Sequence, residues 1–302
     1  MLRAIALGGL TTSALLSVAV TGGTAQDDRT VAIQSMDVRE NLYVISGGGG
    51  HTAALVTEND GVVLVDTKLG GWGQSILETM RLITDQPIST IINTHTHGDH
   101  VGGNVDFPAT VQIVAHENAA TRMRDMEIFA GAGAVGLPDR TVGDTMTLFE
   151  GRDQIDLYHF GAGHTDGDIV VVFPALGMAH LGDLFAFMGT PYIDVKNGGS
   201  GIAYPETLDR IVASIDGVRR VIPGHIPPPP GSPMRGWITW DDLEEYARFN
   251  RDFLDAVRAS KAAGRSVAEA VAALDLRTRY PDHTMDRAAA NVQAIYDELD
   301  AP

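Results

Sequence analysis

The residues with the clearest chemical potential lie in the stretch NTHTHGDHVGG, at 93–103. Within it, the pattern H-x-H-x-D-H is made of His95, His97, Asp99 and His100. Neutral imidazole nitrogen suits zinc, at about 2.0–2.1 Å, and a carboxylate can complete a second site. The pattern begins where a predicted strand (88–93) ends, and a turn at Gly98 can aim the first two histidines at one point and the other two residues at another. This spacing indicates a site for two neighbouring metal ions.

Three further candidate ligands lie downstream, each at a predicted strand end or in a turn between strands. They are His164 in GAGHTDGD, Asp183 in HLGDLF and His225 in VIPGHIP. Loops at strand ends can reach a common face of a layered fold, so these residues can converge on the histidine stretch. With two zinc ions roughly 3.5–4 Å apart, one hydroxide can bridge them. The alternative interpretation is a set of unrelated polar loop residues.

Strands interleaved with helices, in two similar halves, must position these residues. Strands are predicted at 41–46, 51–57, 62–67, 88–93 and 111–116, and then at 154–160, 168–173, 177–183 and 219–224. Helices are predicted at 72–84 and 205–215. This alternation favours a layered α/β domain.

A proline run, PPPPGSP at 227–233, predicts a stiff boundary between the α/β part and a helical C-terminus. Beyond it, Thr239 is a candidate N-cap and Gly264 a candidate end for one long helix, and shorter helical segments are predicted near 266–274 and 285–299. We expect three parts: a leader at 1–25, an α/β domain at 26–232 and a helical extension at 233–302 that covers one side of the domain.

The leader has the layout of a secretory signal peptide. A basic start at Arg3 is followed by an apolar run at 4–20 and by small residues up to Ala25. We therefore expect an exported, most simply periplasmic, protein without a stable membrane anchor. The alternative is an uncleaved N-terminal anchor.

Composition excludes several classes of protein. The chain has no cysteine, which rules out disulfides, thiolate nucleophiles and thiolate metal ligands. Its formal net charge of -17 disfavours nucleic acid as a partner, because phosphate backbones are repelled by an acidic surface. The expected partner is a small-molecule substrate, and the sequence carries no sign of an oligomeric state.

These motifs resemble the metallo-β-lactamase superfamily over roughly 36–230. The resemblance implies a four-layer αββα sandwich with a dinuclear metal site at the edge between its two sheets. It implies that the first metal is held by His95, His97 and His164, the second by Asp99, His100 and His225, and that Asp183 bridges them. The run VLVDT also matches, which implies that Asp66 orients the histidine stretch; a simple turn cap is the alternative. The expected cofactor is two Zn2+ ions, with iron or manganese as alternatives.

The resemblance further implies hydrolysis, in which an activated hydroxide attacks a polarised carbonyl while Asp99 orients it or moves its proton. Asp183 stands where some β-lactamase subclasses carry a cysteine, and is similar to the bridging aspartate of hydroxyacylglutathione hydrolases and lactonases. The expected substrate has an amide, ester or thioester bond, most simply a cyclic one such as a β-lactam or lactone. The alternatives are a hydroxyacylglutathione-hydrolase-like thioesterase and an iron-dependent persulfide dioxygenase.

Two segments supply candidate substrate contacts. His51 follows the glycine run 47–50, and we expect it to overhang the metals on a mobile loop. In FMGTPYIDVKNGGS (187–200), the side chains expected to wall an apolar groove are Phe187, Met188 and Tyr192. The side chains expected to anchor a substrate carboxylate are Lys196, Asn197 and Ser200. The alternative is that the aromatic part is core and NGGS is a turn.

Overall fold

The structure, a computed structural model, describes residues 31–37, 41–225 and 238–301. The predicted signal peptide (1–25) and the proline run that sets the boundary at 232/233 lie outside these residues, so both stay predictions. None of the helices in the described ranges is long and apolar enough to span a membrane.

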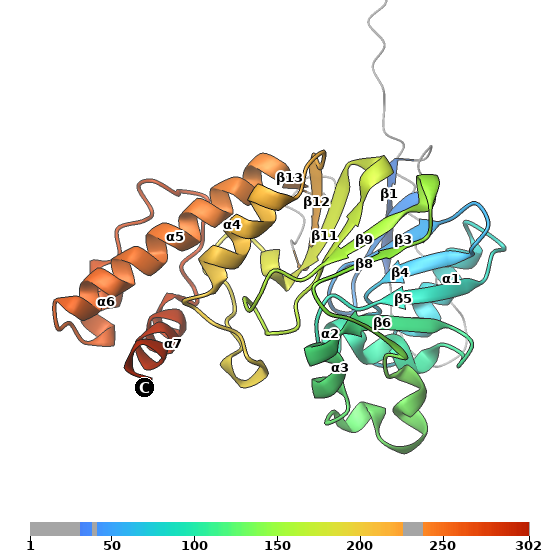
Figure 1. The fold of residues 1–302 in the computed structure, drawn as a ribbon, viewed down its shortest axis with the longest axis horizontal. Helices are drawn as coiled ribbons and strands as arrows, with labels where there is room; N and C mark the ends of the chain where they lie inside the picture. The colour runs from blue at the N-terminus through green and yellow to red at the C-terminus, as the bar shows by residue number, and fades with distance from the viewer. Residues whose placement is uncertain (1–30, 38–40, 226–237, 302) are drawn as a thin grey trace, which may run out of the picture.

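Two mixed sheets form the centre of the molecule (Figure 1). The first contains, in spatial order, β1 (Ala32–Asp37), β2 (Leu42–Ser46), β3 (Thr52–Val56), β4 (Val62–Val65), β5 (Ile88–Ile92), β6 (Gln112–His116) and β7 (Arg140–Val142). The second contains β13 (Ile238–Thr239), β12 (Arg220–Pro223), β11 (Met178–Gly182), β10 (Val170–Phe173), β9 (Ile155–Tyr158) and β8 (Thr145–Leu148). Strands β4 to β7 run parallel to one another, as do β11 and β12, whereas the other neighbours are antiparallel.

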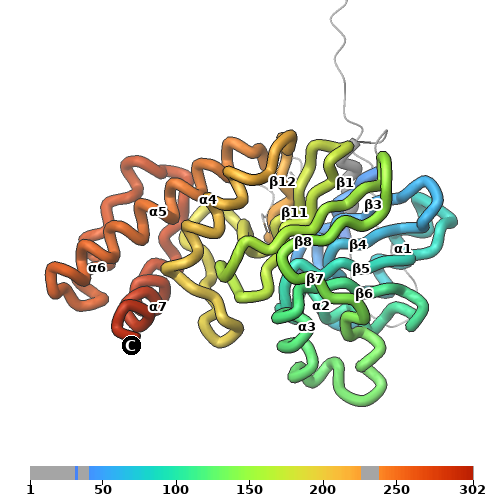
Figure 2. The backbone as a smooth tube through the Cα atoms, in the orientation of Figure 1, coloured from blue at the N-terminus to red at the C-terminus, as the bar shows by residue number. Residues whose placement is uncertain are grey.

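Helices flank the two sheets and extend beyond the second one, as the tube in Figure 2 shows. They are α1 (Gly73–Arg81), α2 (Gly98–Val101), α3 (Glu117–Met123), α4 (Tyr204–Ser214), α5 (Trp240–Ala262), α6 (Val267–Ala273) and α7 (Ala288–Asp300). Long helix α5 starts where the sequence predicts, because the Thr239 hydroxyl accepts from the Asp242 amide and the Asp242 carboxylate accepts from the Thr239 amide.

Three apolar cores separate the layers. One lies between the sheets and joins residues such as Val63 and Ile92 to Leu157 and Val171. A second packs the outer face of the first sheet on α1. The third packs the second sheet on α4 and on the C-terminal helices, which together form one cluster. The predicted four-layer α/β sandwich with C-terminal helices is confirmed.

Four strands were not predicted from the sequence: β1, β7, β8 and β13. In β7 and β8 most side chains are exposed or half-buried; β7 carries no apolar run, and the alternation in β8 covers only four residues. Strand β13 is only two residues long. Edge strands of this kind are set by their neighbours rather than by their own pattern.

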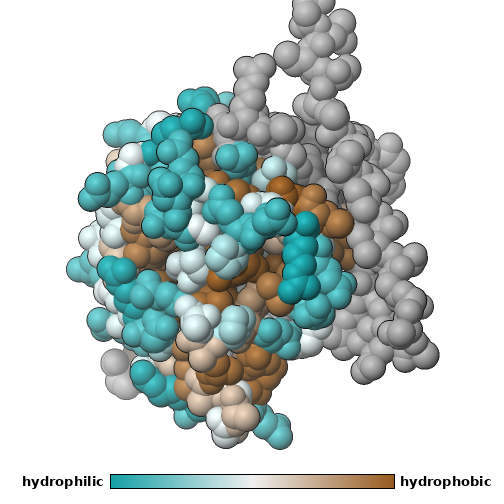
Figure 3. Space-filling view, turned by 90° about the vertical axis from the view of Figure 1, so that its right-hand side faces the viewer, coloured by the Kyte–Doolittle hydropathy of each residue, from teal (hydrophilic) through white to brown (hydrophobic). Residues whose placement is uncertain are grey.

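Hydrophilic and apolar residues share the face of the molecule that Figure 3 draws. Figure 3 faces the right-hand side of Figure 1 and shows apolar residues gathering toward its lower end. The exposed large apolar side chains of the described residues include Ile128 and Val135, from the 3-10 segments Glu127–Phe129 and Gly131–Gly136.

Candidate metal centre

The carboxyl ends of parallel strands bring the predicted residues to one edge. In the first sheet, Asp66 directly follows β4, and the histidine stretch follows β5, its parallel neighbour. In the second sheet, Asp183 follows β11 and His225 follows β12, again a parallel pair. Because parallel strands end at the same edge of a sheet, segments far apart in the chain meet there.

All seven predicted ligands come together in two adjacent clusters. One contains His95, His97, His164 and Asp183, and the other contains Asp99, His100 and His225. Within each cluster, ligand atoms lie within 4.8 Å of one another. Asp183 also reaches the second cluster, since its Oδ1 lies 3.3 Å from both His100 Nε2 and His225 Nε2. The predicted bridging position of Asp183 therefore matches its place between the clusters.

In the first cluster, the imidazoles of His97 and His164 are each turned so that one nitrogen faces the cluster. The Nε2 of His97 donates to Asp194 Oδ2 at 2.7 Å, and the Nδ1 of His164 donates to the Tyr192 carbonyl at 2.7 Å. The opposite nitrogens of these two rings lie 2.9 Å apart. A histidine whose second nitrogen is held by an oxygen presents a lone pair with a fixed direction, which is the arrangement that metal-ligating histidines show.

Asp66 orients the second cluster and the start of the histidine stretch. Its Oδ2 lies 2.7 Å from His100 Nδ1 and accepts a 2.7 Å bond from the Thr94 hydroxyl, while its Oδ1 accepts from the Thr94 amide at 2.8 Å. Since the Thr94 hydroxyl hydrogen is used by Asp66, its oxygen accepts from His95 Nδ1 at 3.0 Å. One buried carboxylate thus fixes two of the histidines, as predicted for this residue.

Among the residues that the structure describes, two buried polar atoms at the centre have no hydrogen-bond partner: His95 Nε2 and Asp183 Oδ1. An unpaired buried acceptor is costly unless a cation satisfies it. Close packing also keeps the space around Asp183 tight, because a Cβ at Gly224 would overlap its Oδ1. The orphaned atoms and the nitrogen and oxygen donor set fit a bound divalent metal.

Charges in the two clusters compensate one another. Burial opposes ionisation of Asp183, but His100 and His225 outweigh it and hold the pKa of Asp183 well below its usual range. Burial lowers the pKa of His225, but the neighbouring carboxylates of Asp183 and Asp99 raise it to about 9. Burial lowers the pKa of His164 to about 4, so this ring is neutral at neutral pH and able to act as a ligand.

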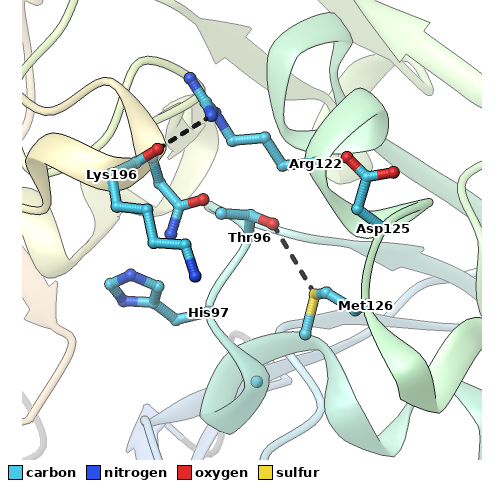
Figure 4. Close-up of a pocket in the computed structure, with 8 residues that line it drawn as sticks. Thr96, His97, Arg122, Asp125, Met126 and Lys196 are labelled. Atoms are coloured by element: carbon cyan, nitrogen blue, oxygen red, sulfur yellow. Dashed lines mark hydrogen bonds between the residues drawn. The ribbon is translucent and has the colours of Figure 1, made fainter.

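A cavity of about 390 Å³ opens beside His97. Figure 4 shows Lys196 extending alongside His97, with Arg122 on the far side of Thr96. The lining residues are Thr96, His97, Gly98, Arg122, Asp125, Met126, Lys196 and Asn197. Arg122 is paired with Asp166, whereas Lys196 is exposed and has no salt bridge among the described residues. Predicted contacts Lys196 and Asn197 therefore do lie beside the metal ligands.

His51 does not overhang the site, so that expectation is wrong. The side chain is 5% exposed, and its Nδ1 donates to the Pro223 carbonyl at 2.9 Å, while its backbone amide donates to the Gly224 carbonyl at 2.8 Å. Burial lowers the pKa of His51 to about 3, which keeps the ring neutral. His51 joins the start of β3 to the end of β12 and so ties the two sheets together.

The apolar groove expected from 187–192 is also corrected. Met188 packs on the core of the C-terminal helices, and neither it nor Phe187 lines the cavity, where Met126 lies among polar and charged residues. Ser200 is engaged elsewhere, because its hydroxyl donates to Glu298 Oε2 at 2.5 Å. Tyr192 does border the site. Its ring stacks on the His97 ring, and the centres of the two rings are 5.8 Å apart.

Two residues of the site escaped the sequence analysis. Asp194, which holds His97, also accepts from the Asn197 amide side chain at 2.6 Å. Arg287, the N-cap residue of α7, places its guanidinium 4.8 Å from the centre of the Tyr192 ring. The position of Asp194 shortly before an NGG turn is a weak sequence signal for its role. No local sequence pattern indicates the role of Arg287.

The fold and the site together define a class, the layered α/β proteins that hold metal in strand-end histidine clusters. A family model described as the metallo-beta-lactamase superfamily matches residues 46–248. The chain therefore belongs to the metallo-beta-lactamase superfamily.

Three relatives show the range of this similarity. A "Metallo-beta-lactamase type 2" of Bacteroides fragilis is 25% identical over 174 residues, which is 57% of this chain and 67% of the relative. A "Hydroxyacylglutathione hydrolase" of Synechococcus sp. is 33% identical over 196 residues, which is 63% of this chain and 62% of that protein. The solved structure of a metallo-beta-lactamase from Pontibacter korlensis has a TM-score of 0.61 and 19% identity, and the match covers 73% of this chain and 99% of that one.

Proposed function

We propose that this protein is a dinuclear zinc hydrolase that opens an amide, ester or thioester bond, most simply a cyclic one such as that of a β-lactam or lactone. The observation that carries the proposal is the pair of ligand clusters, with Asp183 between them. Nitrogen and carboxylate donors without thiolate suit zinc, and iron or manganese are the alternatives that metal analysis separates.

When bound, two such ions lower the pKa of water toward about 7 and polarise a carbonyl. The chain's own residues then do the positioning. His97, His164 and His100 are held rigidly by Asp194, by the Tyr192 carbonyl and by Asp66. Rigid support of this kind keeps catalytic groups within reach of a reacting atom without reorganisation.

Asp99 is the residue placed to handle a proton. Its side chain is 34% exposed, more than any other carboxylate of the two clusters, and its Oδ2 lies 3.1 Å from His225 Nε2. Burial raises the pKa of Asp99, but His225 and His100 lower it further, so the net shift is downward and the group is ionised at neutral pH. An ionised carboxylate can orient an attacking water and accept its proton.

Lys196 is proposed to bind an anionic group of the substrate. Its ammonium lies on the wall of the cavity beside His97, while the other cation there, Arg122, is paired with Asp166. Asn197 also lines this cavity, and its side-chain amide donates to Asp194. A substrate carboxylate next to the scissile bond would satisfy this geometry.

A thioesterase is the second candidate. It is favoured by the 33% identity to the Synechococcus hydroxyacylglutathione hydrolase. This chain has 39 acidic and 22 basic residues, so its charge repels a negatively charged substrate. This repulsion disfavours a glutathione thioester as the substrate. Export to the periplasm also remains part of the proposal, on the basis of the leader's composition.

The test is a turnover screen of zinc-loaded protein against β-lactams, lactones, thioesters and phosphodiesters. We expect hydrolysis of at least one of the first three, two zinc ions per chain by metal analysis, and loss of activity by more than a hundredfold in His97→Ala. Equal turnover by His97→Ala would defeat the metal mechanism. Oxygen consumption with an iron-loaded sample would instead favour a dioxygenase.

The same screen tests the anion site through Lys196→Ala. We expect KM to rise about tenfold or more for carboxylate-bearing substrates, as for the loss of one charge-assisted contact of about 1.5–3 kcal/mol, with kcat little changed. Neutral analogues are the control and should be unaffected. An unchanged KM for every anionic substrate would remove Lys196 from the site.

A further inference from the structure

Lys68 is a buried cation that the proposed reaction does not use. Of the chain's three lysines it alone is fully buried, whereas Lys196 is exposed and Lys261 half-buried. Its ammonium donates to the carbonyls of Ile45 (2.8 Å) and Gly50 (2.9 Å) and makes no salt bridge within the described ranges. Burial lowers the pKa of Lys68 to about 7, against a raising effect of Asp66. Burying a charged group costs free energy, so a buried lysine of this kind is expected to serve a purpose that offsets the cost.

One carbonyl belongs to Ile45, two residues before the glycine run 47–50, and the other to Gly50, the last residue of the run. Lys68 therefore closes this loop across its ends, and the next residue adds a third contact, because the Leu69 amide donates to the Gly48 carbonyl at 3.0 Å. The run has no side chains with which to hold itself, and three of its glycines have positive φ. Its position thus depends on contacts from outside.

The glycine run lies directly on two of the metal ligands. The Gly50 amide donates to the Asp99 carbonyl at 3.0 Å, and a Cβ at Gly50 would overlap the His100 imidazole. From the other side, the Thr67 amide donates to the His100 carbonyl at 2.7 Å. His100 thus lies between the glycine run and the backbone that carries Lys68, and Asp99 is bonded to the glycine run through its carbonyl.

We propose that Lys68 is a positioning residue for the second metal: by holding the glycine run against Asp99 and His100, it sets the affinity of their cluster. The first cluster does not depend on it, since His97 and His164 are held by Asp194 and by the Tyr192 carbonyl. This inference rests on the proposed two-metal function, and it is testable by metal binding without any substrate.

The first test is Lys68→Met, measured by zinc competition with a chelating dye that resolves two binding steps. We expect one of the two steps to lose about tenfold or more in affinity, the order found for residues that support metal ligands, while the other step is unchanged. The control is Lys261→Met, which also removes a lysine bonded to a carbonyl, that of Tyr296 at 2.9 Å, but on the C-terminal helices. Circular dichroism of the metal-free proteins reports whether each variant folds.

Gly50→Ala presses the glycine run directly against His100, so it tests whether the position of the run sets the affinity of this cluster if Lys68→Met does not fold. It should show the same selective loss, whereas Gly143→Ala, where a Cβ meets only ordinary contact, should not. Unchanged affinity in both steps, or equal loss in both, overturns the role of Lys68. Wild-type protein that binds fewer than two zinc ions overturns the proposed function, and this inference with it.

Discussion

At the scale of single residues, one buried carboxylate does most of the ordering in the metal centre. Asp66 has no exposed surface and accepts bonds from His100 and from both donors of Thr94. It also has a positive φ of 63°, a conformation that costs a non-glycine residue about 1–3 kcal/mol. That strain persists because the bonds to Asp66 hold it in place.

We therefore expect Asp66→Asn to weaken metal binding by about 10–100-fold while the fold is kept, since the amide cannot accept all three bonds. Chelator competition and metal analysis measure the loss. Asp106→Asn is a matched control, because Asp106 also accepts a buried amide bond, from Gly73 at 2.8 Å, at the start of α1. Equal metal affinity in wild type and Asp66→Asn would assign Asp66 to turn formation alone.

The ligands could be predicted from sequence because their spacing is local or because each follows a strand end. H-x-H-x-D-H lies within six residues, and Asp183 and His225 each follow an apolar run. The roles of Lys68 and Arg287 could not be predicted from the sequence. Lys68 bonds to Gly50, which lies 18 residues earlier in the chain, and Arg287 contacts the Tyr192 ring, which belongs to another segment. His51 was misplaced for the opposite reason: its neighbouring glycines suggested a free loop, whereas Pro223 holds its ring.

At the scale of elements, strand ends double as helix starts around the site. His116 is the last residue of β6 and the N-cap of α3, where its Nδ1 accepts from the Asn118 amide at 3.2 Å. Its ring stacks on His159 at 3.9 Å between ring centres. Burial, and then the neighbouring His159, lower the pKa of His116 to about 4.

This makes the junction sensitive to acid. The folded chain binds fewer protons than the unfolded chain between the ordinary histidine pKa of about 6.5 and the folded value, so the free energy of unfolding falls as the pH falls through that window. His116→Asn keeps a cap acceptor but does not titrate. In chelator-treated protein, we expect the variant to lose less stability between pH 7 and pH 4 than wild type does, by at most about 1.4 kcal/mol per pH unit. Denaturant titrations at each pH give the slopes, and parallel slopes would contradict the prediction.

The main strands and helices were predictable because their apolar residues face a core with clear periodicity. Strands β3 and β4 are buried over almost their whole length, and α5 starts at a capping box. The short edge strands β7, β8 and β13 were not predictable, because their pairing depends on neighbouring strands from elsewhere in the chain.

At the scale of the whole molecule, the C-terminal helices are continuous with the metal-binding part. Leu243, Phe249 and Val292 share one buried cluster with Val170 and Leu181 of the second sheet. In addition, the Thr190 amide donates to the Thr284 carbonyl at 2.9 Å, next to the segment whose Tyr192 carbonyl holds His164. The C-terminal helices are therefore connected, through backbone hydrogen bonds, to the segment that holds His164 in the first ligand cluster.

We expect the helices and the sheets to unfold in one cooperative transition. The variant Phe249→Ala tests this expectation. Phe249 is fully buried in α5 and packs on Tyr280 and His283, so its loss should cost about 3–5 kcal/mol. If the helices and sheets share one cooperative transition, hydrogen exchange should accelerate in β3 to β5 as well as in α5, and zinc should be released at a lower temperature. Arg258→Ala, on the exposed side of α5, is the control and should stay within about 0.5 kcal/mol of wild type. Faster exchange confined to the C-terminal helices would mean that they form a separate folding unit, and that the metal centre stands without them.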